Sequence, residues 1–319
     1  MSGMNWSVEA VQSKQDRWDA LSLLMNGQAQ EARNQEIERL LHLEEQGELD
    51  FTNLLFVRRG DSSEQKLIAA MLVLIRPDQT GMLWVPVFER KTTTLERGLL
   101  ATQLLQHARQ LIQQKGCWIG QFLLEPSDKS WEATLKANGF PPIGTMLHFE
   151  KFLTQQDQEN WETLQQNACE TQAIHSYSEE IASQFEQAIE KSYQQSCDFP
   201  EVSQGRSASQ ALQGHRQVGV FDPENWKLLT LEGQNAGLVL AACVSPQEDW
   251  ELVYLGLDAE FRGQKLGSFL LAWACARAFS QGGKRMTTGV DSRNGSAVRL
   301  YEKLGFRQVS QQMVFAWIA

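Results

Sequence analysis

The sequence predicts an α/β fold built twice: two tandem domains, each a mixed, mostly antiparallel sheet flanked by helices. The chain has 319 residues, about twice the size of a common single domain. A helix, Gly-Phe and a strand occur near the end of each half, with Gly139-Phe140 and Gly305-Phe306 separated by 166 positions. Repeats of this length are usually whole domains rather than solenoid units. With 42% hydrophobic residues, each copy can form a core of its own.

The first half begins with an expected helix over Ala29–Glu45. Three short runs rich in Val, Leu and Ile follow and are typical of strands: 53–57, 66–75 and 82–88. A helix from Leu100 and another from Trp131 precede a closing strand. This order is that of one α/β unit.

The second half repeats the order, with a helix over 180–194 and strands over 227–233, 236–244 and 251–257. A long helix starts near Leu266. Its apolar residues recur at spacings of three and four, which predicts one buried helix face; they are Leu266, Phe269, Leu270, Trp273 and Ala274. A strand over 286–290, a helix over Ala297–Leu304 and a closing strand complete the unit.

The stretch 154–172 is rich in Gln and Glu and has no apolar period. Such a composition is typical of a linker. We therefore expect domains over 1–153 and 173–319, joined by 154–172.

Charge and composition exclude several classes of protein. The net charge of −10 argues against nucleic acid as the main partner, because an acidic surface repels phosphates. No apolar run approaches the roughly 20 residues that cross a bilayer, and no secretory signal is recognisable, so we expect a cytoplasmic protein without a membrane partner. The five cysteines are odd in number and dispersed, and neither they nor the histidines form a metal motif, so we expect no disulfide framework and no metal.

The segment that carries chemistry begins where the expected strand 251–257 ends. A polar loop there, RGQKLG, runs from Arg262 to Gly267 into the long helix. The amino terminus of a helix offers unpaired N–H groups and the positive end of its dipole, which suits an anion. A plain turn between strand and helix is the simpler interpretation of this loop taken alone.

A second signature lies downstream. Asn294, Ala297 and the run RLYEKLGF from Arg299 to Phe306 resemble the N-x-x-A-x-x-L-Y-E-K-x-G-F segment of the GNAT superfamily of acyl-CoA N-acyltransferases. The upstream loop resembles that family's pyrophosphate loop, R/Q-x-x-G-x-G/A. The resemblance covers about 172–319 and implies a GNAT N-acetyltransferase domain.

The resemblance implies acetyl-CoA as co-substrate. Main-chain N–H groups of the loop would wrap its pyrophosphate, the strand end would pair with its pantetheine arm, and Asn294 would lie near that arm. The cofactor-binding residues are Leu255, Gly256, Leu257, Arg262, Gly263, Gln264, Lys265, Leu266, Gly267 and Asn294. Lys265 departs from the family, which usually has glycine there: lysine adopts a left-handed backbone at greater cost, although its ammonium can pair with phosphate.

Two catalytic residues follow from the same resemblance. Tyr301 stands where the family places the general acid that protonates the departing thiolate, the alternative being a packed helix tyrosine. Glu251 stands where many members place a carboxylate that takes the amine proton, the alternative being a solvated residue at a strand start. By strand alternation, Tyr254 should face the side opposite to Glu251.

The region between the first helices of a GNAT domain shapes the acceptor site. Tyr193, Asp198, Arg206 and His215 are the candidate substrate contacts there. For each taken singly, a surface loop with Asp198 as a helix cap is the simpler interpretation.

The first half lacks these features. Of the loop glycines only Gly98 remains, and the residues opposite Asn294 and Tyr301 are Asp128 and Leu135, which serve neither a phosphate-bearing ligand nor a proton transfer. The first copy therefore resembles a GNAT domain that has lost its cofactor site.

We thus expect transfer of an acetyl group to a primary amine by direct attack in a ternary complex, with a small molecule or a lysine-bearing substrate as acceptor. The tandem arrangement also occurs elsewhere in the superfamily. Two alternatives stay open: a non-catalytic acyl-CoA-binding or scaffold protein, and an aminoacyl transferase using charged tRNA, which the net charge disfavours.

Overall fold

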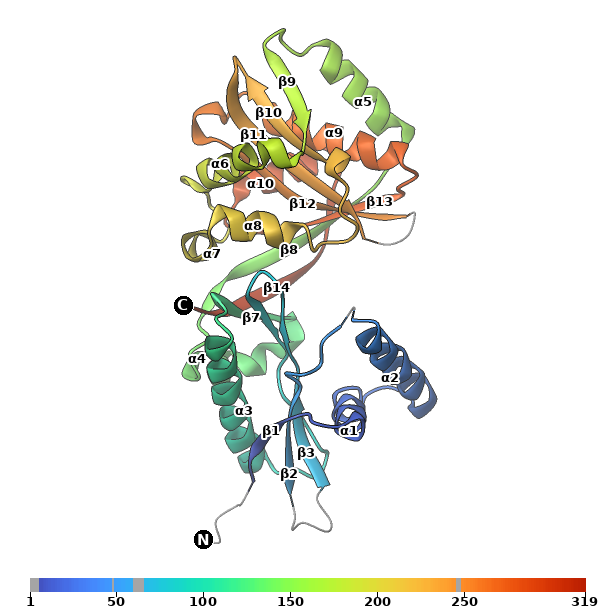
Figure 1. Cartoon of the computed structure of the whole chain (residues 1–319), viewed down its shortest axis with the longest axis vertical. Helices are drawn as coiled ribbons and strands as arrows, with labels where there is room; N and C mark the ends of the chain where they lie inside the picture. The colour runs from blue at the N-terminus through green and yellow to red at the C-terminus, as the bar shows by residue number, and fades with distance from the viewer. Residues whose placement is uncertain (1–5, 48, 60–65, 245–247) are drawn as a thin grey trace. The chain divides into compact units, whose positions relative to one another are not determined.

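The computed structural model describes residues 6–47, 49–59, 66–244 and 248–319. The chain forms two compact units (Figure 1). Unit 1 combines the residues up to Ile143 with Met313–Ala319, and unit 2 is Gly144–Gln312. Among the described residues, no helix is long and apolar enough to cross a membrane.

The division of the chain differs from the expected linker at 154–172. Helix α5, Gln155–Gln166, occupies most of that stretch and starts with a capping box between Thr154 and Asp157. Its Trp161 is buried against Phe269, with ring centroids 4.8 Å apart. Since Asp157 and Trp161 alone are buried along this helix, the sequence shows no apolar period, yet the helix belongs to unit 2.

The strands of unit 1 fall into two groups. Their strand orders are β1-β2-β3-β6 and β4-β5-β7-β14. The strands are β1 (Val8–Ala10), β2 (Leu55–Arg59), β3 (Lys66–Met71), β4 (Val73–Ile75), β5 (Thr80–Leu83), β6 (Val87–Phe88), β7 (Ile119–Leu124) and the end of β14 (Arg307–Ile318), and the α-helices are α1 (Lys14–Leu24), α2 (Gln30–Glu45), α3 (Thr94–Gln114) and α4 (Glu132–Ala137).

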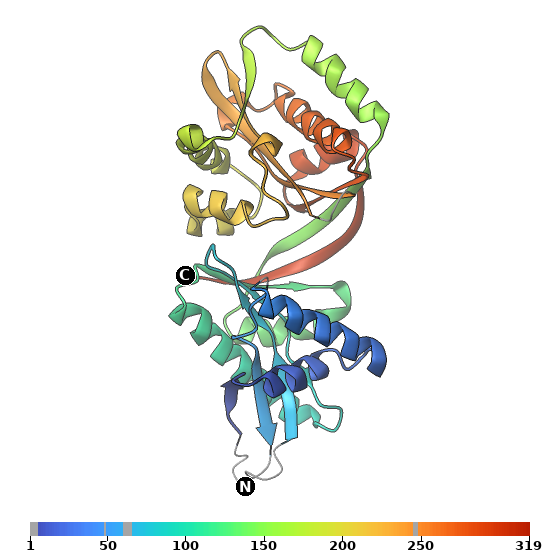
Figure 2. The same cartoon turned by 45° about the vertical axis from the view of Figure 1, so that its right-hand side comes forward.

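Helices cover both faces of the β1-β2-β3-β6 sheet (Figure 2). On one face Leu21 of α1 and Ile37 of α2 pack with Phe56, and on the other Leu104 of α3 packs with Val57. The expected strand 66–75 is broken at Leu72, and its two parts, β3 and β4, enter different sheets.

Unit 2 is one mixed sheet in the order β8-β13-β12-β11-β10-β9. Its strands are β8 (Pro142–Phe152), β9 (Gln172–Ser176), β10 (Trp226–Leu231), β11 (Gln234–Cys243), β12 (Asp249–Leu257) and β13 (Arg285–Asp291). Its helices are α5, α6 (Ala182–Tyr193), α7 (Pro200–Gly205), α8 (Ala208–His215), α9 (Leu266–Ser280) and α10 (Gly295–Lys303). One face packs on α6 and α8 and the other on α5 and α9 (Figure 1).

The internal repeat is visible in backbone detail. Gly139 and Gly305 both have φ +86°, the left-handed conformation that glycine adopts without steric cost. The next residue makes the same bond in each unit: the N–H of Phe140 donates to Leu135 and the N–H of Phe306 to Tyr301, both at 3.0 Å. The helix that precedes each Gly-Phe pair therefore ends in the same motif in both units.

The closing strands are exchanged between the halves of the sequence. Met313–Ile318 of β14, from the second half, pairs antiparallel with β7 in unit 1. Residues Met146–Phe152 of β8, from the first half, pair antiparallel with β13 in unit 2. The expectation that each half closes its own sheet was therefore wrong, because the alternation of a strand does not specify which edge it joins.

Candidate active site

The two central strands of unit 2 separate at Glu251. Strands β12 and β13 pair in parallel over Asp249–Glu251 and Arg285–Thr287. Beyond this point the Thr288 hydroxyl donates to the Leu252 carbonyl at 3.1 Å. The remainder of β12, up to Leu257, forms one edge of the opening between the strands.

A β-bulge at Val253 changes which way β12 directs its side chains. Leu252 lies opposite Ala241 and Tyr254 opposite Leu240, so Val253 is the extra residue. Glu251 lies opposite Ala242, two positions from Leu240, and therefore shares a sheet face with Tyr254. The expectation of opposite faces was wrong. Both residues face the side of α6 and α8, because Leu240 and Tyr254 pack in the core there.

The end of β12 offers backbone groups to a ligand. The N–H of Asp258 donates to Ala236 of β11 at 3.0 Å. Since N–H groups alternate in direction along a strand, those of Leu255 and Leu257 point away from β11 and into the opening. Gly256 is required for packing: a Cβ there would lie 2.7 Å from Ser192 Oγ and 2.8 Å from the Tyr254 ring.

The loop after β12 adopts the backbone that the family pattern assigns to glycine. Gly263 has φ +80° and Lys265 has φ +63°, ψ +8°. Lys265 thus accepts the left-handed conformation despite its Cβ, which costs about 1 kcal/mol. Residues 263–265 are exposed, and no side chain caps the amino terminus of α9. The N–H groups of this helix start are therefore available to an anion, and the loop residues fit a diphosphate.

Arg262 binds protein backbone. Its guanidinium donates to the carbonyls of Ser192, Gln194 and Gln195, at 2.8–3.2 Å, and also to that of Leu257. These carbonyls lie at the end of α6 and of β12, so Arg262 joins the loop to the helix that carries Tyr193. In the same loop, the amide of Gln264 donates to Glu260 at 3.5 Å. The other two expected loop residues, Leu266 and Gly267, are buried at the start of α9.

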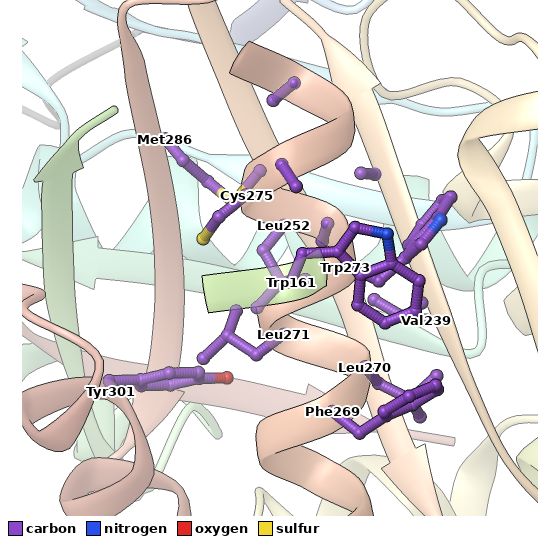
Figure 3. Close-up of a cluster of buried hydrophobic side chains, with 14 of the residues drawn as sticks. Trp161, Val239, Leu252, Phe269, Leu270, Leu271, Trp273, Cys275, Met286 and Tyr301 are labelled. Atoms are coloured by element: carbon purple, nitrogen blue, oxygen red, sulfur yellow. The ribbon is translucent and has the colours of Figure 1, made fainter. Parts of the chain in front are cut away.

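Tyr301 lies in the core on the side of α9, next to Leu271 (Figure 3). It is 6% exposed and packs on Phe149 and Phe306, each with ring centroids 5.7 Å away. Burial raises the pKa of its phenol, the nearby Asp198 carboxylate raises it further, and a hydrogen bond with Thr288 opposes both. The phenol therefore keeps its proton at neutral pH and has one to donate.

Asn294 has a local structural role. Its side-chain oxygen accepts the N–H of Ala297 at 3.2 Å and so caps helix α10, and it also accepts the Ser296 hydroxyl at 2.9 Å. A contact with the pantetheine arm stays a prediction.

Three of the four candidate substrate contacts gather around one aromatic cluster. The ring of Tyr254 lies 6.4 Å from that of Tyr193 and 5.1 Å from that of His215. Ser192 Oγ donates to the Ile189 carbonyl at 2.7 Å, so the Tyr254 hydroxyl, also 2.7 Å from Ser192 Oγ, donates to it. Arg206 donates to the carbonyls of Gln210 and Ala211 and, with Tyr193, lines a hollow of about 520 Å³ between α6 and α8.

Asp198 is held by the end of β13. Its Oδ1 accepts the N–H of Asp291 at 2.8 Å, and Asp291 Oδ2 accepts the N–H of Phe199 at 3.1 Å. Arg293 binds Asp291 at 2.6 and 2.9 Å and Glu201 bidentately at 2.8 Å. Burial raises the pKa of Asp198, which also acts electrostatically on Tyr193, Tyr254 and Tyr301. Asp198 thus acts electrostatically both on the acceptor cluster and on Tyr301. Its carboxylate accepts the N–H of Asp291 rather than one at a helix start.

Sequence reasoning overlooked Ser192, Asp291 and Arg293. The last two stand in DSRNG, directly before the segment that carries Asn294 and Tyr301. The carboxylate of Asp291 and the guanidinium of Arg293, at the end of an expected strand, could have indicated a polar site from the sequence.

Unit 1 differs at the matching positions. Helix α3 starts with a capping box between Thr93 and Glu96, and Glu96 accepts the Thr93 N–H at 2.8 Å. The carboxylate of Glu96 already binds at this helix start and would repel an anion there. Leu135, at the position of Tyr301, is fully buried.

Comparisons with known proteins agree with this geometry. The model of the acetyltransferase (GNAT) family matches residues 190–306. A mycothiol acetyltransferase from Thermobispora bispora is 31% identical over 123 residues, which are 37% of this chain and 41% of that protein. The matched part thus spans less than half the length of this curated relative.

Two solved structures are similar over almost the whole chain. A GCN5-related N-acetyltransferase from Sphaerobacter thermophilus has a TM-score of 0.54 at 16% identity, covering 98% of this chain and 95% of its own. A tandem GNAT protein from the clavulanic acid biosynthesis pathway has a TM-score of 0.51 at 14% identity, covering 98% of both chains. These likenesses concern the fold.

The chain thus resembles the acetyltransferase (GNAT) family over residues 190–306. Its two-unit arrangement matches the fold of a tandem GNAT protein.

Proposed function

We propose that unit 2 is an acetyl-CoA-dependent N-acetyltransferase that acetylates a primary amine by direct attack in a ternary complex. The observation that carries the proposal is the separation of β12 and β13 beside an uncapped α9 amino terminus. Backbone N–H groups of residues 263–267 would hold the diphosphate of acetyl-CoA, and those of Leu255 and Leu257 would pair with its pantetheine arm. When bound, acetyl-CoA supplies the acetyl group as a thioester.

Two side chains would move protons. Glu251, on the face of α6 and α8, takes a proton from the ammonium of the acceptor, and the free amine forms the new C–N bond to the acetyl carbon. As the C–S bond breaks, the sulfur takes the proton of Tyr301, which recovers one as the product nitrogen loses its second proton. The balance is one amide, one free thiol and one released proton for each ammonium consumed.

Unit 1 would have no part in this chemistry. Its equivalent helix start is closed by Glu96, and Leu135 replaces the tyrosine. We propose that it is a GNAT copy without a cofactor site. The alternative of a non-catalytic acyl-CoA-binding protein predicts cofactor binding without turnover.

The test is to incubate the protein with acetyl-CoA and a panel of primary amines, and to measure thermal stabilisation and thiol release. We expect both, and we expect Glu251→Gln to reduce kcat by about 10²-fold while acetyl-CoA binding is kept. Thermal stabilisation by acetyl-CoA without thiol release with any amine would favour the non-catalytic alternative. If acetyl-CoA gave no thermal stabilisation and no amine gave thiol release, the proposal would be refuted.

A further inference from the structure

The ammonium group of Lys151 lies where β8 meets the end of helix α10. Its Nζ donates to the carbonyl of Leu304, the last residue at the carboxyl end of that helix, and pairs with Oδ1 of Asp157 in α5 at 2.5 Å. The side chains of Lys151 and Asp157 are 14% and 5% exposed, so the ion pair is held largely out of solvent. Because a lone buried charge is costly, Asp157 fixes the ammonium at this point.

Helix α10 is short, and few of its side chains are buried. Tyr301 is its one buried side chain, and Asn294 caps its amino terminus. The last carbonyls of a helix have no partner within the helix, and a cation beside them also interacts favourably with the helix dipole. Lys151 therefore serves at the carboxyl end of α10 as Asn294 serves at the other end.

The strand that carries Lys151 also contacts Tyr301 directly. Phe149 lies two positions earlier on β8, on the same strand face, and its ring centroid is 5.7 Å from that of Tyr301. Phe306, two positions after Leu304, packs on Tyr301 at the same separation. Since Phe149 belongs to β8 and Phe306 follows α10, the bond from Lys151 to Leu304 joins the two elements that hold the Tyr301 ring.

Unit 1 provides a comparison within the same chain. At the repeat spacing of 166 positions, Phe149 corresponds to Phe315 and Lys151 to Trp317. Phe315 packs in one cluster with Leu135, so the aromatic contact of the strand is kept in unit 1. The ammonium is not kept. The lysine thus occurs in the unit whose helix carries a tyrosine, and it is absent where leucine occupies that position.

We propose that Lys151 is a positioning residue for Tyr301, because it holds the end of α10 against β8 and α5 and so fixes the place from which the phenol gives its proton to sulfur. The inference rests on the proposed function for the role of Tyr301. Lys151 itself donates to Leu304 and Asp157 and takes no part in the proton transfer. A displacement of about 1 Å at a reacting group can cost about a hundredfold in rate, so the loss of this bond should lower kcat.

The first test is kinetic and uses Lys151→Met, which removes the ammonium and keeps a long side chain. With the most active amine of the panel, we expect kcat to fall by about tenfold to a hundredfold with little change in the KM for acetyl-CoA. In the Tyr301→Phe background the same change should cause no further loss of kcat, because residues that act as a unit are not additive. Lys303→Met, the same change at an exposed position of α10, should match the parent protein.

A second variant allows for the cost of an unpaired carboxylate. Lys151→Met leaves Asp157 buried without its cation, which is strongly destabilising. The double variant Lys151→Met/Asp157→Asn removes both charges, and the amide keeps an oxygen for the Thr154 N–H. Since the Leu304 carbonyl loses its donor in both variants, we expect the same loss of kcat from the double variant.

A second measurement needs no turnover. The chain has four tyrosines, so a protein with isotope-labelled tyrosine rings gives few NMR signals, and Tyr301→Phe identifies the signal of Tyr301. The ring currents of Phe149 and Phe306 make the chemical shift of this ring depend on its position. We expect the Tyr301 signal to move in the double variant and to stay in place in Lys303→Met.

The outcomes separate the two proposals. Absence of acetyl transfer in the parent protein would refute the proposed function, and the NMR signal would still report whether Lys151 positions the Tyr301 ring. An unmoved Tyr301 signal in the double variant would refute the role of Lys151. The same conclusion would follow if Lys151→Met lowered kcat as much in the Tyr301→Phe background as in the parent protein.

Discussion

Asp198 and Asp291, 93 positions apart, are joined by a 2.8 Å hydrogen bond that the backbone N–H of Asp291 donates to the carboxylate of Asp198. The Asp198 carboxylate, held by this bond, raises the pKa of Tyr193, Tyr254 and Tyr301. A single backbone donor leaves most of the desolvation of this carboxylate unbalanced. Replacing the Asp198 carboxylate should therefore change the free energy of unfolding measurably.

Asp198→Asn is expected to be more stable than the parent protein at pH 7. Because the pKa of Asp198 is raised on folding, the stability that this residue gives is fully present below its ordinary pKa of 3.8 and is lost as pH rises through the folded value. The amide does not titrate, so the difference in unfolding free energy should vanish as pH falls below about 4. Urea unfolding at several pH values, with Glu302→Gln as control, measures it. A parent protein more stable than the variant at pH 7 would contradict the expected sign.

Tyr301→Phe is expected to reduce kcat by about 10²-fold and to leave acetyl-CoA binding unchanged, because the phenol is the proposed proton donor. The variant keeps the aromatic contacts with Phe149 and Phe306 and loses the bond with Thr288, so its stability should fall by about 1 kcal/mol. Since the pKa of this phenol is raised above 10, its ionisation should not limit the rate below that pH. Steady-state kinetics with calorimetric binding test this, and a kcat within threefold of the parent would assign Tyr301 to packing alone.

Replacement of Lys265 separates backbone strain from charge. Lys265→Gly removes both, whereas Lys265→Ala removes the ammonium and keeps a Cβ at φ +63°. We expect the glycine variant to be more stable than the alanine variant by about 1 kcal/mol.

The two Lys265 variants should bind acetyl-CoA alike, and both more weakly than the parent protein at low salt, if the ammonium meets a phosphate. Unfolding curves and binding at two salt concentrations check both points. Equal stabilities would show that the left-handed backbone carries no cost here.

Arg262→Lys is expected to destabilise the protein by about 1–3 kcal/mol, although the charge is kept. One ammonium cannot reproduce the bonds that the planar guanidinium makes to Ser192, Gln194, Gln195 and Leu257. Since these carbonyls precede and follow Tyr193, the KM for the amine should rise as well. Lys303→Ala, on the exposed side of α10, is the control. Unchanged melting and an unchanged KM would refute the role of Arg262 in holding the end of α6.

The sequence was sufficient for the repeated fold because the Gly-Phe pairs and the apolar period of α9 reflect local rules. Gly139 and Gly305 need a positive φ, and the apolar residues of α9 are buried as predicted. The expectation of a single buried face was wrong, because consecutive residues from Phe269 to Ala276 are all buried. The bulge at Val253 left no such trace, since no glycine marks it, and a single extra residue reverses the facing of every residue beyond it. The positions of Arg293 and Asp198 also escaped prediction, because their bonds join segments about 90 residues apart.

The strand exchange has a consequence for how the chain is made. Strand β7 pairs with β5 on one side and with Met313–Ile318 on the other, and that second neighbour lies beyond all of unit 2 in the sequence. The sheet of unit 1 is therefore complete only after the residues of unit 2 have been synthesised, although almost all residues of unit 1 precede them. A chain divided between residues 153 and 154 would give a first piece without the β14 partner of β7 and a second piece without the β8 partner of β13.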